Sequence, residues 1–450
     1  MPFKKGFVWG AASSAYQIEG AVNEGGRGKT VWDTHCEKLG AIKNGESGAV
    51  ACDHYRRMES DLDLFASLDI NAYRFSLAWT RLLPEGTGKV NNEGLDFYDR
   101  MIDGLLERGI DPYVTLFHWD YPQALFERGG WLNRDSADWF ADYAAVVAKR
   151  YSDRVKNFLT LNEPQCFVQG HANGEHAPGQ RYADAELCKV AHHCMLAHGK
   201  AVAALRANAG QRLSLGIALC GNPKFPDTDS PPDQEAALAC TESMIAGFGS
   251  DVLYMEPIYR GQIPPVLLDK YPMYSQNIQK DDLKIISAPL DVFAVNMYTA
   301  YYIKASGIGK FEWLPRRSGV PVNSLGWATV PEVVYAGAKY YQEKYKLPIL
   351  VTENGYCGLD CPDSNGEIHD NDRINFISRY LAQLKKAADE GVDVTGYFYW
   401  SIMDNFEWSH GYDPRFGLIH VDYASQKRTV KQSGKWYAQM IRSHAKNFTE

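Results

Sequence analysis

Two glutamates, Glu163 and Glu353, each stand at the end of a short segment with the pattern of a strand. The segment at 347–351 is unbroken, which is typical of a strand buried on both faces, so Glu353 stands where that strand surfaces. The segment at 155–161 precedes an Asn-Glu-Pro sequence, whose proline lacks the N–H that a strand ladder needs. Two carboxyl groups held close together cannot easily both ionise, so one pKa rises and the pair can divide acid and base work.

Either glutamate alone has an ordinary alternative, as a solvated loop residue or a helix N-cap. The pair is more informative. If both strands belong to one parallel barrel, both carboxylates lie at its C-terminal rim, where active sites of that fold are built.

The elements that would place them there alternate along the whole chain. Strands are predicted at 7–12, 71–79, 112–119, 155–163, 212–219, 290–298, 347–353 and 394–400. Helices are predicted at 61–69, 95–108, 137–151, 186–208, 234–255, 331–345, 371–390 and 429–444. This order predicts an α/β fold, a single (β/α)8 TIM barrel over residues 1–450. The long loops at 19–54, 222–232 and 301–327 are expected to enlarge the C-terminal face of the strands.

Composition limits the class of partner. The formal charge of -8 argues against a nucleic-acid partner, because such proteins carry clustered Lys and Arg. No stretch approaches the roughly 20 apolar residues of a membrane span, and the N-terminus lacks the apolar core of a signal peptide. The nine scattered cysteines favour free thiols in a reducing compartment, so we expect a cytoplasmic protein without a membrane partner. The oligomeric state stays open.

Aromatic residues make up 13% of the chain, including 11 Trp and 27 Tyr. They could form a large aromatic core, or a sugar site in which rings stack on the pyranose and polar groups meet its hydroxyls. The expected strand ends favour such a pocket. They present Gln17, Arg74, His118, Trp119, Asn162, Glu163, Asn296, Tyr298, Glu353 and Trp400, and the next loop adds Glu407 and Trp408.

Four segments, 7–20, 160–164, 351–355 and 400–408, resemble those of family 1 glycoside hydrolases, the β-glucosidase family, and the resemblance extends over essentially the whole chain. It implies a retaining β-glycosidase, foremost a β-glucosidase acting on a small-molecule β-glycoside, with no cofactor. By similarity, Glu163 is the acid/base and Glu353 the nucleophile. That chemistry needs two carboxyl groups about 5–5.5 Å apart.

The resemblance also implies sugar contacts. The expected substrate-binding residues are Gln17, His118, Trp119, Asn162, Asn296, Trp327, Trp400, Glu407, Trp408 and Phe416. Among them Trp400 would be the stacking floor, Trp327 would wall the leaving-group side, and Glu407 would be a charged hydrogen-bond acceptor.

Arg74 and Tyr298 are expected to hold Glu353 as the anion, which would leave Glu163 protonated near neutral pH. Gln165 stands where many relatives have Trp, so contacts with the leaving group remain open.

Three alternatives compete. A 6-phospho-β-glycosidase would bind phosphate with Ser, Lys and Tyr in the loop where this chain has Glu407, Pro414 and Phe416, and an anion there would repel phosphate. A non-catalytic sugar-binding barrel would be favoured by loss of either catalytic glutamate, and both are present. A metal hydrolase would draw on the helical group His192, His193, Cys194 and His198. These share no helix face with a carboxylate partner, so packing is favoured and no metal is expected.

Overall fold

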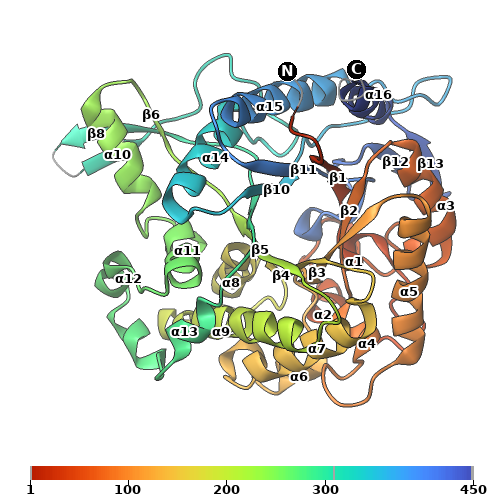
Figure 1. The fold of residues 1–450 in the computed structure, drawn as a ribbon, viewed down its shortest axis with the longest axis horizontal. Helices are drawn as coiled ribbons and strands as arrows, with labels where there is room; N and C mark the ends of the chain where they lie inside the picture. Colours follow the sequence, from red (N-terminus) through yellow and green to blue (C-terminus); the bar gives the residue numbers. More distant parts are fainter. Residues whose placement is uncertain (1–2, 308–309, 447–450) are drawn as a thin grey trace.

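The computed structural model describes residues 3–307 and 310–446 (Figure 1). Eight parallel strands close into a barrel in the order β1-β11-β10-β7-β5-β4-β3-β2. They are β1 (Val8–Ala12), β2 (Ala72–Ser76), β3 (Asp111–Phe117), β4 (Asn157–Asn162), β5 (Ser214–Cys220), β7 (Phe293–Asn296), β10 (Ile349–Asn354) and β11 (Val394–Trp400). The predicted (β/α)8 barrel is confirmed.

Helices surround these strands (Figure 1). The long ones are α3 (His54–Ser67), α5 (Asn92–Glu107), α7 (Ser136–Tyr151), α9 (Asp184–Asn208), α14 (Glu332–Tyr345), α15 (Asn371–Asp389) and α16 (Gln432–Lys446). Their buried residues recur three or four positions apart, as Leu95, Tyr98, Ile102 and Leu105 do in α5. That spacing places one apolar face of the helix against the barrel.

Shorter helices occupy the connections. They are α1 (Ala15–Ile18), α2 (Val31–Cys36), α4 (Trp79–Leu82), α6 (Gln123–Glu127), α8 (Pro164–Asn173), α10 (Pro231–Thr241), α11 (Asp251–Arg260), α12 (Pro265–Lys270) and α13 (Asp282–Ile286). The single helix predicted at 234–255 is wrong, because α10 ends at Thr241 and α11 begins at Asp251. Gly247 between them has a φ of +59°, a conformation that glycine adopts without steric cost.

Other predictions also differ from the structure, and the helix predicted at 61–69 is α3, which begins at His54. The loops predicted at 222–232 and 301–327 contain a small sheet of β6 (Phe225–Pro226), β8 (Tyr302–Gly307) and β9 (Lys310–Trp313). The helix predicted from 429 begins at Gln432, because β13 (Lys427–Val430) pairs with β12 (Ile419–Asp422). Both sheets lie outside the barrel, where the alternation of strand and helix no longer predicts the order of elements.

The strand ends that carry the two glutamates are irregular. Against β7, β10 shifts register between Val351 and Glu353, and against β5, β4 shifts between Leu159 and Asn162. Such irregularities redirect side chains at strand ends. Glu163 itself has a φ of +46°, which costs a residue other than glycine about 1–2 kcal/mol. The surrounding fold therefore has to hold Glu163 in place.

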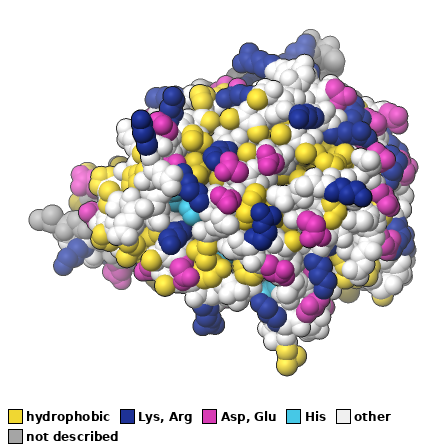
Figure 2. All heavy atoms as spheres, turned by 90° about the horizontal axis from the view of Figure 1, so that it is seen from below, with side chains coloured by type: hydrophobic (Ala, Val, Ile, Leu, Met, Phe, Trp, Pro, Cys, Tyr) yellow, Lys and Arg dark blue, Asp and Glu magenta, His cyan; other side chains and the backbone are white. Residues whose placement is uncertain are grey.

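On the face drawn in Figure 2, Lys and Arg side chains are intermixed with Asp and Glu. Among the described residues, no helix is long and apolar enough to cross a membrane.

Candidate active site

A cavity of about 350 Å³ opens at the C-terminal ends of the barrel strands. Most of the predicted site residues line it, namely His118, Trp119, Glu163, Asn296, Tyr298, Trp327, Glu353, Trp400, Glu407, Trp408 and Phe416. Arg74, Asn162 and Gln17 lie behind this lining and are hydrogen-bonded to it. The structure therefore brings all the predicted residues to one place.

Glu353 is held by two strong donors. The Arg74 Nη1 donates to Oε1 at 2.7 Å, and the Tyr298 hydroxyl donates to Oε2 at 2.8 Å. Arg74 is 1% exposed and also donates to Asn162 Oδ1 at 2.6 Å. Burial and the Glu353 charge raise the pKa of Tyr298 well above its ordinary value, so its phenol keeps the proton that it donates. These contacts fix the direction of both carboxylate oxygens.

Opposing effects determine the pKa of Glu353. Burial raises it to about 7 and the neighbouring Glu163 adds to the rise, whereas Arg74 and Tyr298 lower it. The predicted contacts are present, but burial of the carboxylate outweighs them. Sequence does not reveal how completely the Glu353 carboxylate is buried, so this balance between burial and the two contacts could not be predicted.

This balance gives a testable pH dependence. Tyr298→Phe removes the hydrogen bond from the Tyr298 hydroxyl, which lowers the pKa of Glu353. The pKa of Glu353 should therefore be higher in this variant. If the ionised form of Glu353 is the reactive one, the acidic limb of kcat/KM should move to higher pH, by about half to one unit for one charge-assisted hydrogen bond. Arg74→Met should move it in the same direction. A pH-rate profile with an acidic limb that hardly moves in either variant contradicts this.

Glu163 is positioned by the same network. Its backbone N–H donates to Ala218 O at 2.8 Å, and its Oε1 accepts from Asn296 Nδ2 at 2.9 Å. Asn296 also donates to Asn162 Oδ1 at 3.2 Å, the atom that accepts from Arg74. One chain of hydrogen bonds from β2, β4, β7 and β10 thus connects the two glutamates.

A neutral histidine lies beside the expected stacking floor. The His118 ring is stacked on Trp400 with 5.6 Å between centroids, and its Nε2 is 3.2 Å from Asn162 Nδ2. Burial and the Arg74 charge lower the pKa of His118 well below its ordinary value. An Nε2 that accepts from the amide leaves the proton on Nδ1, which has no partner among the described residues and can donate to a ligand.

Glu407 is a third buried carboxyl in the cavity. Gln17 Nε2 donates to Phe406 O at 2.9 Å and reaches Glu407 Oε2 at 3.4 Å. Burial and the charges of Glu353 and Glu163 raise the pKa of Glu407 to about 8. Burial thus opposes the charged form that was expected for this hydrogen-bond acceptor.

Aromatic rings form the walls. Trp119 and Trp408 lie 4.7 Å apart between centroids, and Trp119 Nε1 donates to Asn162 O at 2.9 Å. Trp327 contacts Tyr298 at 5.5 Å and Phe416 at 6.0 Å, and it is 37% exposed. Its exposure places Trp327 at the mouth of the cavity.

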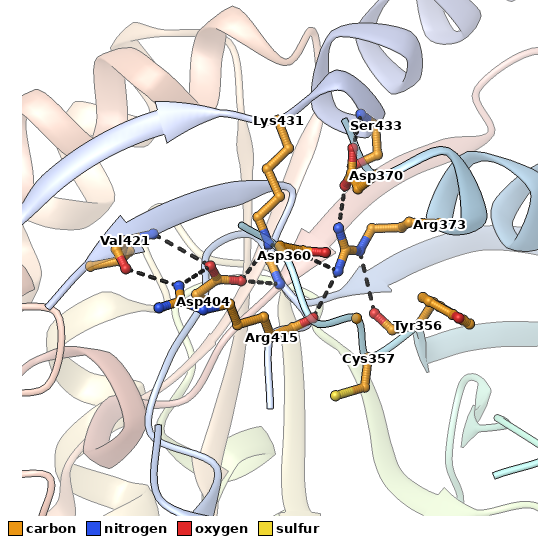
Figure 3. Close-up of polar contacts among 12 residues, drawn as sticks. Tyr356, Cys357, Asp360, Asp370, Arg373, Asp404, Arg415, Val421, Lys431 and Ser433 are labelled. Carbon is orange, nitrogen blue, oxygen red and sulfur yellow. Dashed lines mark hydrogen bonds and ion pairs between the residues drawn. The ribbon is translucent and has the colours of Figure 1, made fainter. Parts of the chain in front are cut away.

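A buried ion network anchors the loop that carries Glu407, Trp408 and Phe416 (Figure 3). The carboxylate of Asp404 lies between Lys431 Nζ at 2.6 Å and Arg415 Nη1 at 2.7 Å. Lys431 also pairs with Asp360, and Asp360 pairs with Arg373 of α15 at 2.7 Å. Burial alone would raise the pKa of Asp404, but the two cations reverse this and the pKa is lowered. The loop thus depends on charges far away in the sequence.

We expect Lys431→Met to lower the free energy of unfolding by about 3–5 kcal/mol, because the buried carboxylates of Asp360 and Asp404 then lose a cation that both of them pair with. Lys431 is fully buried. Urea unfolding measures the loss, and Lys435→Met is the matched control, because Lys435 forms an exposed pair. Equal stability of the two variants contradicts the prediction.

Sequence reasoning missed part of the lining, namely Cys166, His176, Cys220, Asn222, Thr299, Tyr301, Leu325 and His410. Cys220 ends β5. The strand-end rule, by which residues at the C-terminal ends of the barrel strands are expected to line the site, would therefore have found Cys220 too. Gln165, left open by the sequence, is buried and donates to Cys220 O at 3.2 Å, behind the lining. Cys166, the next residue, lines the cavity instead.

The histidines considered for a metal hydrolase lie in α9, and their rings contact residues outside this helix. His192 Nε2 is 2.8 Å from Asp282 Oδ2, His193 Nδ1 is 2.9 Å from Trp131 O, and His198 Nδ1 is 2.6 Å from Thr160 Oγ1. Each ring thus contacts a different neighbour. These contacts agree with the expectation that the group packs against its neighbours.

Comparisons with known proteins agree with this site. A profile described as glycosyl hydrolase family 1 matches residues 1–446. Beta-glucosidase A of Thermotoga maritima is 41% identical over 446 residues, or 98% of each chain. A bifunctional beta-D-glucosidase/beta-D-fucosidase of Bifidobacterium breve is 41% identical over 475 residues, or 99% of each chain.

A solved structure of the family 1 β-glucosidase from Thermotoga maritima, in complex with isofagomine lactam, superposes with a TM-score of 0.90. It is 40% identical and the match covers 98% of this chain and 99% of that chain. Sequence match, fold and the paired strand-end glutamates lead to the same conclusion. The chain belongs to glycosyl hydrolase family 1.

Proposed function

We propose that this protein is a retaining β-glycosidase that acts mainly as a β-glucosidase on terminal β-D-glucosyl residues of oligosaccharides and aryl glucosides. The observation that supports this most is the pair Glu163 and Glu353 in one cavity, joined by one hydrogen-bond network. Two such carboxyl groups supply the acid and the nucleophile that double displacement requires.

In the first step, an Oε of Glu353 attacks the anomeric carbon while the bond to the leaving oxygen breaks and Glu163 protonates that oxygen. Arg74 and Tyr298 keep Glu353 aimed at the sugar through their contacts with its two oxygens. The product is a glycosyl ester of Glu353 and a free alcohol.

In the second step, ionised Glu163 takes a proton from water, and the water oxygen attacks the anomeric carbon and releases Glu353. Esterification has removed the negative charge of Glu353, so ionised Glu163 no longer faces a like charge. Two inversions give net retention of the β configuration.

The cavity favours an uncharged sugar. Among the described residues that line it there is no Lys or Arg, and phosphate recognition relies on such cations. The lining therefore argues against a 6-phosphoglycoside as the substrate. Gln17 and Glu407 can meet either configuration at position 4. The fucosidase activity in the name of the Bifidobacterium breve relative makes β-fucosides a natural second substrate.

We also propose that the protein is located in the cytoplasm. All nine cysteines are free thiols in the structure. Unpaired cysteines in this number are typical of a reducing compartment.

The test is hydrolysis of p-nitrophenyl β-glucoside, β-galactoside, β-fucoside and β-glucoside 6-phosphate, with the first-formed anomer identified by NMR. We expect turnover of the unphosphorylated sugars with the β-anomer first. No turnover of any substrate despite measurable glucose binding would support a sugar-binding barrel, and the α-anomer first would overturn the retaining mechanism.

A further inference from the structure

Two thiols lie beside Glu163 at the wall of the cavity. Cys166 is in the first turn of α8 and Cys220 ends β5, and their Sγ atoms are 3.5 Å apart. Both line the cavity together with Glu163. One ligand atom from each of the three side chains lies within 4.8 Å of the others. The double displacement proposed above uses the carboxylate but neither thiol.

The local fold explains this arrangement. Glu163 is the N-cap of α8, and Cys166 N–H donates to Glu163 O at 2.9 Å, so the two side chains leave the same turn. Glu163 N–H donates to Ala218 O, which ties this turn to the end of β5 where Cys220 stands. The three side chains therefore converge because α8 begins against β5.

The spacing suits a tetrahedral thiophilic cation. Two sulfurs that each lie about 2.3 Å from Zn²⁺ are about 3.8 Å apart in a tetrahedron, close to the distance between these thiols. Two sulfurs and one carboxylate oxygen select Zn²⁺ or Cd²⁺ over Mg²⁺ and Ca²⁺, which prefer oxygen. All three residues line the cavity, so a cation can reach them through it.

Outer contacts hold two of the three ligands. Gln165 Nε2 donates to Cys220 O at 3.2 Å, and Gln165 Oε1 accepts from Cys220 N–H at 3.4 Å. Asn296 Nδ2 donates to Glu163 Oε1 at 2.9 Å and leaves Oε2 for a cation. Contacts of this kind orient metal ligands.

We propose that Glu163, Cys166 and Cys220 form a binding site for a thiophilic divalent cation of the Zn²⁺ class, and that the bound cation inhibits the enzyme. Binding displaces one proton from each thiol and the proton of the Glu163 carboxyl group into solvent. It also occupies the carboxylate that has to protonate the leaving group. The inhibitory part rests on the proposed function, whereas the binding part does not.

Cd²⁺ is the probe, because cadmium–thiolate bonds absorb in the ultraviolet and report sulfur ligation directly. We expect a band that saturates at one Cd²⁺ per chain in the wild type. Cys166→Ala and Cys220→Ala should each weaken binding by at least about tenfold, since each removes one of three ligands. Cys166→Ser is the second variant if the alanine protein does not fold.

Two controls separate this site from other cation sites. Cys361→Ser removes an exposed thiol and should leave the band unchanged. The exposed group Asp363, Glu367 and His369 could also bind a cation but contains no sulfur, so it adds no band. Glu163→Gln should weaken Cd²⁺ binding as well, and this measurement needs no activity.

The rate measurement tests the inhibitory part. Half-inhibition of aryl glucoside hydrolysis should occur at the Cd²⁺ concentration that half-saturates the band, with each variant compared with its own cation-free rate. A band that survives both alanine substitutions overturns the site. Saturation without inhibition, or binding that Glu163→Gln leaves unchanged, overturns the role of Glu163. Absence of activity in the wild type would refute the proposed function while the absorption test still decides the binding.

Discussion

Glu353→Ala is expected to lower kcat/KM for p-nitrophenyl β-glucoside by at least about 10⁴-fold, as removal of a covalent nucleophile does elsewhere. The carboxylate is 4% exposed, and Arg74 and Tyr298 aim both of its oxygens. Without it, the carboxylate that the proposed mechanism esterifies is missing. Glu332→Ala is a matched control, because Glu332 lies in the first turn of α14 outside the cavity lining, and it should retain nearly full activity.

Added azide should restore part of the lost rate. Deletion of the carboxylate leaves room for a small anion on the face of the sugar opposite the leaving group. One inversion by azide then gives the α-glucosyl azide, which NMR distinguishes from the β-anomer. A Glu353→Ala protein that keeps more than a tenth of the wild-type rate, or that forms the β-azide, would contradict the assignment of Glu353.

The barrel could be predicted from the sequence because its strands are apolar segments buried on both faces. The segment at 347–351 is an example, and it became β10. The sheet of β8 and β9 was not predictable in the same way. Most residues of that hairpin are partly or fully exposed, so burial imposes little pattern on them.

The site could be predicted as far as the strand-end rule was applied. It found Glu163, Asn296 and Glu353, because parallel strands of a barrel bring their C-terminal ends to one rim. Applied to β5 it would also have found Cys220.

The charge state of the site was not predictable. The pKa of Glu353 depends on the balance between burial and the contacts with Arg74, and the pKa of Glu407 depends on burial and two other carboxylates. Residue types show which groups meet, but the degree of burial comes only from the packed structure. The loop of Glu407 likewise depends on Asp404 and Lys431, whose pairing no local pattern indicates.

Glu163→Ala is expected to slow the first step by an amount that depends on the leaving group. Cellobiose releases a poor leaving group that needs a proton, so its kcat/KM should fall by about 10²–10⁴-fold. A dinitrophenyl glucoside releases a stable phenolate without protonation, so its kcat/KM should change by less than about tenfold. Its kcat should still fall, because hydrolysis of the glycosyl ester needs Glu163 as the base, and a rapid burst of phenolate should precede the slow steady state.

Azide also distinguishes the roles of the two glutamates, through the second step of the reaction. In Glu163→Ala the ester with Glu353 still forms, and azide attacks it from the side that Glu163 occupied, without needing a base. Two inversions give the β-glucosyl azide, opposite to the product expected from Glu353→Ala. An equal loss for cellobiose and the dinitrophenyl glucoside would contradict the acid/base assignment, since a merely structural defect would not depend on the leaving group. The paired anomers thus assign each carboxylate to its own face of the sugar, which neither variant establishes alone.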